Sequence, residues 1–220
     1  MKKALIFRGG WEGHEPVQVS ELLGDILCKN GIKVDIFDGV ECLKDRDKLM
    51  EYSLVVPCIT LGDAPEAYID NLSYAVSQGV GLAGCHGMTS AFMCSPQWHF
   101  MTGGQWVAHP GNDGVTHTVN ICHGANPIVE GISDFTLCSE QYYLHVDPAI
   151  EVLATTRFPV SDGYHCTNKP VDMPVVWTKF WGRGRVFYSS IGHTAALFKE
   201  CPECEILIER GMLWAIDGKK

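Results

Sequence analysis

The sequence has no apolar run that approaches the length of a membrane span, and it has little positive charge. Its 17 Lys and Arg residues stand against 26 Asp and Glu residues, which gives a net charge of −9. General binding to nucleic acid or to an anionic membrane needs a basic surface, so we expect neither partner. The apolar run near the first residue is too short for a signal peptide, so we expect a cytoplasmic protein.

Several chemical motifs are also missing. No HxH or HExxH spacing occurs, and no GxGxxG fingerprint stands at a turn between a strand and a helix. CPEC at residues 201–204 is the sole CxxC pair, and most of the 10 cysteines lie in apolar runs, where they behave as small hydrophobic residues. No bound NAD is expected, and the motifs predict no cofactor.

What the chain does contain is 46% hydrophobic residues, arranged in its first half as alternating strands and helices. Continuous apolar runs predict buried strands, and apolar residues at helical spacing predict the helices between them. The strands are predicted at 2–10, 32–39, 54–59 and 80–84, and the helices at 16–31 and 65–79. This alternation indicates an α/β fold with a parallel sheet that has helices on both faces.

The second half has a different pattern. Residues 95–114 are rich in Gly, Pro, Trp and His without clear periodicity, which predicts a long irregular segment of the kind that is often functional. Strands are predicted at 115–122, 135–144, 151–158, 173–181 and 185–192, with a hairpin at GRG between the last two, and a closing helix at 201–218. No linker or repeat is evident, so residues 1–220 are predicted to form a single domain.

Ligands of open parallel sheets bind beyond the carboxyl ends of the strands, and one strand is predicted to end at Gly84. The turn Gly84-Cys85-His86-Gly87 resembles a nucleophile elbow, a strained strand-to-helix turn that presents one side chain to solvent. Either Cys85, as a reactive thiol, or His86 stands at its tip, because a shift of one residue in register exchanges the two.

Two further segments carry candidate binding or catalytic groups. In GGQWVAHPG, His109 is expected outside the core and Trp106 is expected either to stack on a sugar or to plug the core. In SEQYYLHVDP, Glu140 and Tyr142 lie on the same face if residues 135–144 form one strand. There they would bind a polyol or transfer protons.

The remaining histidines fall into two groups, apart from His145, which stands just beyond Glu140 and Tyr142 and is ambiguous. His14 and His193 follow predicted strands beside glycines, as His86 does, and are candidate site residues. Four others have no comparable setting and are expected at the surface or satisfied in the core: His99, His117, His123 and His165. The candidate histidines could also hold a divalent metal such as zinc, although no metal-binding spacing supports this.

Seven segments together resemble the ThuA-like family, named for trehalose utilisation, in collinear order over nearly the whole chain. They are GGWEGHEP, GVGLAGCHGM, GGQWVAHPG, NPIVEGISDF, SEQYYLHVDP, MPVVWTKFWGRGRVFYSSIGHT and ERGMLWA. The resemblance implies a class I glutamine amidotransferase-like fold, a flavodoxin-like three-layer α/β sandwich with a mainly parallel central sheet. It also implies a role in the catabolism of trehalose or related disaccharides, beside sugar oxidoreductases that make 3-keto sugars.

The resemblance bears on single residues as well. The family pattern has histidines matching His14, His86, His109 and His193 and a Glu-x-Tyr matching Glu140 and Tyr142. The position of Cys85 is usually aliphatic in the family, which favours His86 as the functional residue. Ser139 stands where the family usually has Asp. Thr194 and Ala195 replace the end of the late His-x-Glu of amidotransferases, so no glutaminase activity is expected.

We therefore expect a lyase, isomerase or hydrolase that acts on a disaccharide or 3-keto-glycoside. The expected roles are a base for His86 or His109, its acid/base partner for Glu140, and substrate binding for His14, Trp106, Tyr142 and His193. Two alternatives stay open: a non-catalytic sugar-binding protein or dehydrogenase partner, and a metal-dependent hydrolase with zinc held among the four candidate histidines. A sugar oxidoreductase of the same pathway and a second copy of the chain are the protein partners considered.

Overall fold

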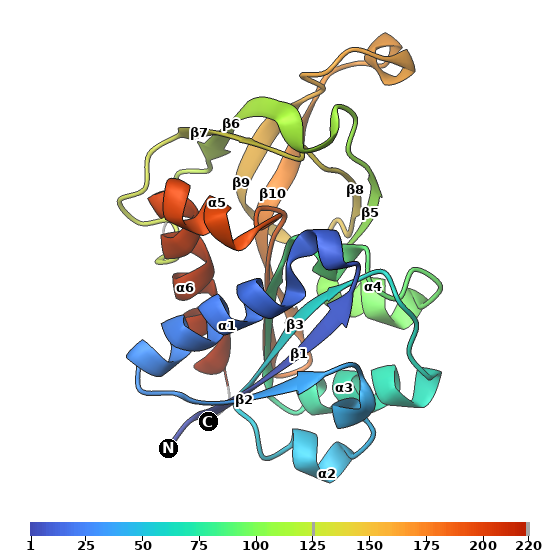
Figure 1. Ribbon diagram of the computed structural model, residues 1–220, viewed down its shortest axis with the longest axis vertical. Helices are drawn as coiled ribbons and strands as arrows, with labels where there is room; N and C mark the ends of the chain where they lie inside the picture. Colours follow the sequence, from blue (N-terminus) through green and yellow to red (C-terminus); the bar gives the residue numbers. More distant parts are fainter. Residues whose placement is uncertain (125, 219–220) are drawn as a thin grey trace.

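The computed structural model describes residues 1–124 and 126–218, which form three layers with helices on both faces of a large sheet (Figure 1). The strands are β1 (Lys3–Gly10), β2 (Lys33–Asp38), β3 (Leu54–Thr60), β4 (Gly81–Cys85), β5 (Gly104–Ala108), β6 (Val115–Ile121), β7 (Phe135–Ser139), β8 (Tyr143–Val146), β9 (Glu151–Phe158), β10 (Val171–Trp181) and β11 (Gly184–Ser189). The helices are α1 (Pro16–Lys29), α2 (Arg46–Leu49), α3 (Glu66–Ser77), α4 (Pro96–Thr102), α5 (Ala195–Glu200) and α6 (Pro202–Ile216).

The order of strands in the large sheet is β2-β1-β3-β4-β11-β10-β9-β6-β7 within the described residues. Strands β2, β1, β3, β4 and β11 are parallel, whereas β10, β9, β6 and β7 continue the sheet with antiparallel pairing. Strands β5 and β8 form a separate antiparallel pair. Strand order reverses at β1, because the chain goes first to β2 on one side and then to β3 on the other, which creates a topological switch point.

Alternate side chains of the parallel strands serve two hydrophobic cores. Ile6 of β1 belongs to the core beneath α1 and α6, and its neighbours Leu5 and Phe7 belong to the core beneath α3. Both cores are therefore continuous with the sheet, as the period of two in a strand requires. Figure 1 shows α1, α5 and α6 on one side of the sheet and α3 with α4 on the other.

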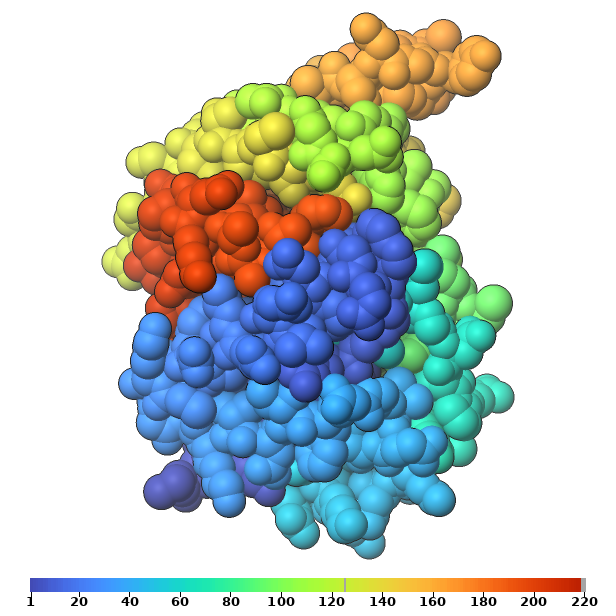
Figure 2. All heavy atoms as spheres, in the orientation of Figure 1, coloured from blue at the N-terminus to red at the C-terminus, as the bar shows by residue number. Residues whose placement is uncertain are grey.

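The predicted α/β fold and most of the predicted elements are confirmed, with strand and helix ends shifted by one to three residues. The hairpin at GRG is confirmed too, since Trp181 pairs with Gly184 across it. Among the described residues, none of the helices combines the length and apolarity needed to cross a bilayer. Figure 2 shows the segment between β9 and β10, which carries the fully exposed Tyr164, standing out from the body.

Two sequence predictions were wrong. Residues 95–114 are not one irregular segment, because they contain α4 and β5; Ser95 caps α4 by accepting a hydrogen bond from the Trp98 amide. Residues 135–144 are not one strand, because the chain leaves the large sheet after Ser139 and pairs with β5 from Tyr143 onward. A helix as short as α4 has too few residues to show a helical period of apolar positions. A strand that leaves one sheet for another keeps the same alternation of apolar and polar residues, so the sequence does not reveal the change of sheet.

A buried ion pair ties the small sheet to the large one. Lys179 of β10 contacts the carboxylate of Asp147, which follows β8, and Lys179 Nζ also donates to the Phe100 carbonyl. The side chains of Lys179 and Asp147 are 6% and 13% exposed. The hydrogen bond from Lys179 lowers the pKa of Asp147 despite the opposing effect of burial.

We expect Asp147→Asn to lower the free energy of unfolding at pH 7 by about 3 kcal/mol, because it leaves a buried ammonium without its carboxylate. Since the folded-state pKa of Asp147 is lowered, the pair stabilises the fold above the unfolded pKa of about 3.9 and loses that contribution as pH falls below it. Urea unfolding at pH 7 and pH 3 should therefore show a difference between wild type and variant that shrinks at the lower pH.

The exposed pair of Arg157 and Asp172 provides the control, because both of its side chains are more than half exposed. Asp172→Asn should cost less than about 1 kcal/mol. Equal losses in the two variants would show that the buried pair contributes nothing beyond a surface contact.

Candidate functional site

Three histidines follow the carboxyl ends of parallel strands and meet at one point. His14 comes after β1, His86 directly after β4, and His193 four residues after β11. The elements that carry them are joined beyond the strands, where the amide of Ala195 donates a 3.0 Å hydrogen bond to Glu15 Oε2. The switch-point region named by the sequence therefore holds the candidate site.

His86 stands at the tip of the strained turn after β4. Its φ of 44° lies in the left-handed region, which is uncommon for a residue with a side chain and often marks functional sites. Tyr188 Oη donates a 2.8 Å hydrogen bond to the His86 carbonyl and so holds the turn in place. Cys85 is buried in the core, and burial raises the pKa of its thiol far above the usual range. The structure thus decides the register that the sequence left open.

One hydrogen bond orients the His86 ring. His86 Nδ1 lies 2.9 Å from the Ser190 carbonyl oxygen, and since a carbonyl only accepts, Nδ1 carries a proton. In the neutral ring, Nε2 therefore presents a lone pair. His14 is fixed in a similar way, with its Nδ1 2.7 Å from Thr60 Oγ1.

Four groups surround His86 Nε2 at hydrogen-bond or near-contact distance. The shortest separations are 2.9 Å to Tyr142 Oη and 3.1 Å to Glu140 Oε2. His193 Nδ1 lies at 3.2 Å and His14 Nε2 at 3.3 Å. We call His14, His86, Glu140 and His193 the histidine–glutamate cluster.

Glu140 and Tyr142 reach the cluster from the point where the chain changes sheets. Gln141 between them is buried and anchors the crossing: its Nε2 donates to Thr156 Oγ1 at 2.9 Å and to the Arg157 carbonyl at 3.0 Å. Glu140 and Tyr142 both point toward His86 Nε2. They do so where the chain crosses between sheets, held by the hydrogen bonds of Gln141, and not through the alternation of a continuous strand.

His109 and Trp106 form the edge of the site nearest the small sheet. His109 Nδ1 lies 3.5 Å from Glu140 Oε2, and the His109 side chain is 30% exposed. The Trp106 ring lies 5.3 Å from the His109 ring and 6.3 Å from that of Tyr142, and it also packs against the core. Trp106 is half-buried and adjoins the site, so it packs on the core as one expectation had it, and stacking on a sugar stays a prediction.

The sequence prediction that the turn presents its tip residue to solvent was wrong. His86 is only 2% exposed, and Glu140 and Tyr142 are buried with it, because the small sheet and the crossing at 140–142 cover the ends of the parallel strands. The exposed ring at the edge of the cluster is Trp11, 52% exposed and 4.7 Å from the His14 ring.

Burial and charge set the protonation of the cluster. Burial lowers the pKa of His14 to about 3, and it lowers the pKa of His193 as well. For Glu140, burial raises the pKa, but the interactions with His86, His109 and His193 outweigh it and bring the pKa to about 2. Burial raises the pKa of Tyr142 well above its usual range, so the phenol keeps its proton. An ionised carboxylate therefore faces His14 and His193, whose lowered pKa values favour the neutral ring.

The histidines set aside in the sequence lie outside this cluster. His117 is buried and bonds the Val115 carbonyl, and His99 is half-buried beside the Gly104 carbonyl. His165 lies in the projecting segment and contacts the Ser161 carbonyl, and His123 is exposed. These placements agree with the expected surface or core roles except at His99, whose buried Nε2 has no hydrogen-bond partner among the described residues.

Several contributors escaped sequence reasoning. Thr60 follows a predicted strand, Tyr188 lies within another, and Ser190 acts through its backbone carbonyl, so the residue types alone did not indicate these roles. Gln141 stood between two singled-out residues but was assigned no role. Trp11 belongs to the motif GGWEGHEP, and its closeness in sequence to His14 was the one feature that could have marked it as a site residue. In the structure its ring contacts that of His14.

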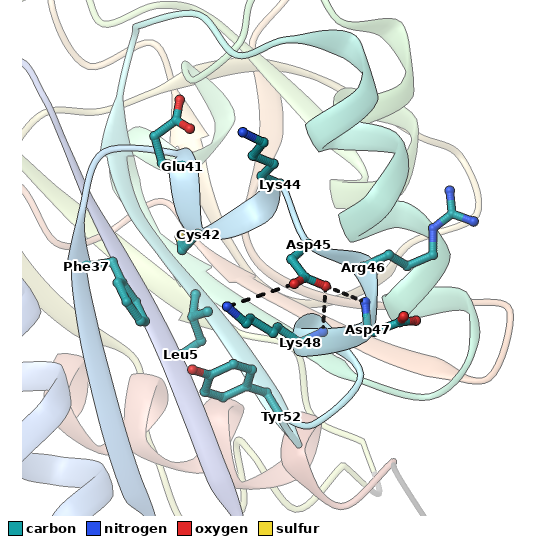
Figure 3. A pocket seen from close by; sticks show the side chains of 10 residues that line it. All are labelled: Leu5, Phe37, Glu41, Cys42, Lys44, Asp45, Arg46, Asp47, Lys48 and Tyr52. Atoms are coloured by element: carbon teal, nitrogen blue, oxygen red, sulfur yellow. Dashed lines mark hydrogen bonds and ion pairs between the residues drawn. The ribbon is translucent and has the colours of Figure 1, made fainter.

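A larger hollow lies elsewhere and contains none of the candidate residues. It measures about 560 Å³ and opens between β2 and α2 (Figure 3). On its charged rim, Asp45 caps α2 by accepting hydrogen bonds from the Asp47 and Lys48 amides. The Asp45 carboxylate also lies 3.9 Å from Lys48 Nζ. This hollow is therefore separate from the candidate site.

The architecture places the protein in the class of glutamine amidotransferase-like α/β folds. A glutamine amidotransferase from Thermotoga maritima superposes with a TM-score of 0.53 at 12% identity, over 98% of this chain and 90% of that one. A ThuA-like protein from Parabacteroides merdae gives 0.78 at 21% identity, over 99% and 91% of the two chains. Another from Bacteroides uniformis gives 0.74 at 20% identity, over 97% and 91%.

The model of the ThuA family, described as trehalose utilisation, matches residues 3–215. The chain belongs to this family, which confirms the resemblance read from its motifs and indicates a carbohydrate-related function. No curated protein matches the chain significantly.

The contact between Gly87 and Thr60 gives a test of how the turn positions His86. A Cβ on Gly87 would lie 1.9 Å from Thr60 Oγ1, so an added methyl must displace the turn or β3. We expect Gly87→Ala to lower the free energy of unfolding by roughly 1–3 kcal/mol, measured by urea unfolding. Gly114→Ala, which meets open space, is the matched control and should change little. Equal stability of both variants would contradict tight packing at the turn.

Proposed function

We propose that the protein is an enzyme of carbohydrate catabolism that acts on a disaccharide or 3-keto-glycoside at the histidine–glutamate cluster. The observation that carries this proposal is the convergence of polar groups from distant segments at one end of the sheet. Among them, Tyr142 Oη and Glu140 Oε2 lie 2.9 and 3.1 Å from His86 Nε2. Membership of the trehalose-utilisation family supports the substrate class.

The surroundings suit an uncharged polyol. The buried carboxylate of Glu140 disfavours an anionic ligand at the cluster, and so does the net charge of −9. Trp11 and Trp106 flank the cluster from opposite segments of the chain, and aromatic faces pack well on the apolar faces of sugar rings. Hydroxyl groups of the sugar would find both donors and acceptors among the imidazoles.

A keto group at C3 of a glycoside makes elimination the chemistry that these groups serve best. The carbonyl acidifies the C2–H bond, so a base removes that proton. The electron pair forms a C1–C2 double bond as the C1–O bond breaks, and the departing oxygen takes a proton. No oxidant, reductant or further reactant is needed, and each well-positioned acid or base contributes about 10²–10⁴-fold.

His109 is the better placed base of the two considered. Its side chain is partly exposed, and among the described residues no group hydrogen-bonds its buried Nδ1, which lies 3.5 Å from Glu140 Oε2. His86 is instead enclosed and fixed by Ser190. Glu140 would then stabilise the protonated His109, and Tyr142, which keeps its proton, would donate to a substrate oxygen.

We expect His109→Asn to lower kcat for a 3-keto-disaccharide by about 10²–10⁴-fold while the melting temperature changes little, since the side chain is partly exposed. His145→Asn is the matched control, because His145 is exposed and lies outside the cluster. The measurement is steady-state release of the free sugar.

An unchanged kcat in His109→Asn would show that His109 is not the catalytic base. Saturable binding of 3-keto-disaccharides without any turnover by the wild type would instead favour the non-catalytic sugar-binding role.

A further inference from the structure

We propose that the histidine–glutamate cluster is a binding site for one divalent transition-metal ion, zinc above all. The ligand atoms are Nε2 of His14, Nε2 of His86, Nδ1 of His193 and a carboxylate oxygen of Glu140. Each residue offers one such atom, and the four atoms lie within 4.8 Å of one another.

The separations match a coordination sphere. Zinc binds imidazole nitrogen and carboxylate oxygen at about 2.0–2.2 Å, so neighbouring ligands of a tetrahedral ion lie about 3.3 Å apart. From His86 Nε2, the distances to the atoms of His193, His14 and Glu140 are 3.2, 3.3 and 3.1 Å. Two of the other three edges are longer. His14 Nε2 lies 4.0 Å from the same Glu140 Oε2, and His193 Nδ1 lies 3.6 Å from the second carboxylate oxygen, Glu140 Oε1.

Hydrogen bonding alone does not satisfy these atoms. His86 donates through Nδ1 to Ser190, so its Nε2 brings a lone pair to the centre of the cluster. Tyr142 has a single proton to give, and among the described residues no donor hydrogen-bonds the buried Glu140 Oε2. The one proton of Tyr142 cannot satisfy both His86 Nε2 and Glu140 Oε2, and a cation at this point would bind both atoms.

The outer contacts are those of metal-ligating histidines. Such a histidine usually donates its second ring N–H to a carbonyl or another acceptor, which fixes the ring and raises its basicity. His86 does this toward the Ser190 carbonyl, and His14 contacts Thr60 Oγ1 through Nδ1. In His86 the nitrogen turned to the cluster is thereby left free to bind an ion, and His14 turns its Nε2 toward the same point.

The donor set selects the class of ion. Three imidazoles and one carboxylate suit Zn²⁺, Co²⁺, Fe²⁺ or Ni²⁺, whereas Ca²⁺ and Mg²⁺ prefer oxygen ligands. Neutral imidazoles bind metals, and burial favours the neutral form of His14 and His193. A dication would also balance the buried Glu140 carboxylate.

When bound, such an ion supplies a Lewis acid for a carbonyl or hydroxyl oxygen. Its part in turnover rests on the proposed function, but its binding does not. The two claims can therefore fail separately: a tightly bound ion in a protein that turns over no sugar leaves the site standing, and full turnover by metal-free protein overturns any role of the ion in the reaction.

The test is titration of chelator-treated protein with Zn²⁺ by calorimetry and with Co²⁺ by visible absorption. We expect one equivalent of each and a Co²⁺ spectrum without the near-ultraviolet charge-transfer band of thiolate ligands, which separates this site from binding by the 10 cysteines. Absence of stoichiometric binding, or a thiolate band, would overturn the proposal.

Variants locate the site. Glu140→Gln and His193→Asn should weaken binding by about 100-fold or more, and Thr60→Val, which removes the outer partner of His14, by about 10–100-fold. His145→Asn should bind as wild type does. Circular dichroism and thermal unfolding confirm that each variant is folded, and His193, which is only half-buried, is the substitution the fold tolerates best. Wild-type affinity in folded Glu140→Gln and His193→Asn would contradict the ligand set.

Discussion

The site depends on the hydrogen bond from His86 Nδ1 to the Ser190 carbonyl, 2.9 Å long and buried. It joins the residue after β4 to the residue after β11, two strands that lie side by side in the sheet. By placing the proton on Nδ1, it turns the Nε2 lone pair toward three other segments of the chain. Strain at the elbow, where φ is 44°, is held by Tyr188 and by the close fit of Gly87 against Thr60. Preorganised groups of this kind are what active sites are built from.

The fold makes a histidine, and not a thiol, the residue at the tip of the elbow. In this class of α/β sheet the turn after a central strand is the natural place for a reactive side chain. Here Cys85 is the last residue of β4 and faces the core, so the amidotransferase-like architecture presents an imidazole. Covering the strand ends with β5, β8 and the crossing at 140–142 then encloses the cluster. Because water is excluded, the effective dielectric constant around the cluster is low, and electrostatic interactions between its groups are stronger than at the surface.

The sequence predicted the parallel half of the sheet well because buried strands and amphipathic helices leave strong local patterns, as in Leu54–Thr60 and Pro16–Lys29. It also named His14, His86, His109 and His193, since each stands after a predicted strand or among glycines, and Glu140, which shares one face of a predicted strand with Tyr142. It did not foresee that Glu140 and Tyr142 enter from a crossing between two sheets, because strand pairing is a long-range property. Nor did it foresee the enclosure of His86, which depends on how β5 packs. The metal hypothesis had no support from ligand spacing, because its ligands come from four segments that only the fold brings together.

The central claim is that lone pairs converging on His86 Nε2 create a cation site. The most direct measurement is an anomalous difference map from crystals grown with Zn²⁺, recorded on both sides of the zinc absorption edge. The account predicts one strong peak about 2.0–2.2 Å from His86 Nε2 and from the facing atoms of His14, His193 and Glu140. A map with no peak at the cluster, or with zinc bound solely at cysteines, would contradict it.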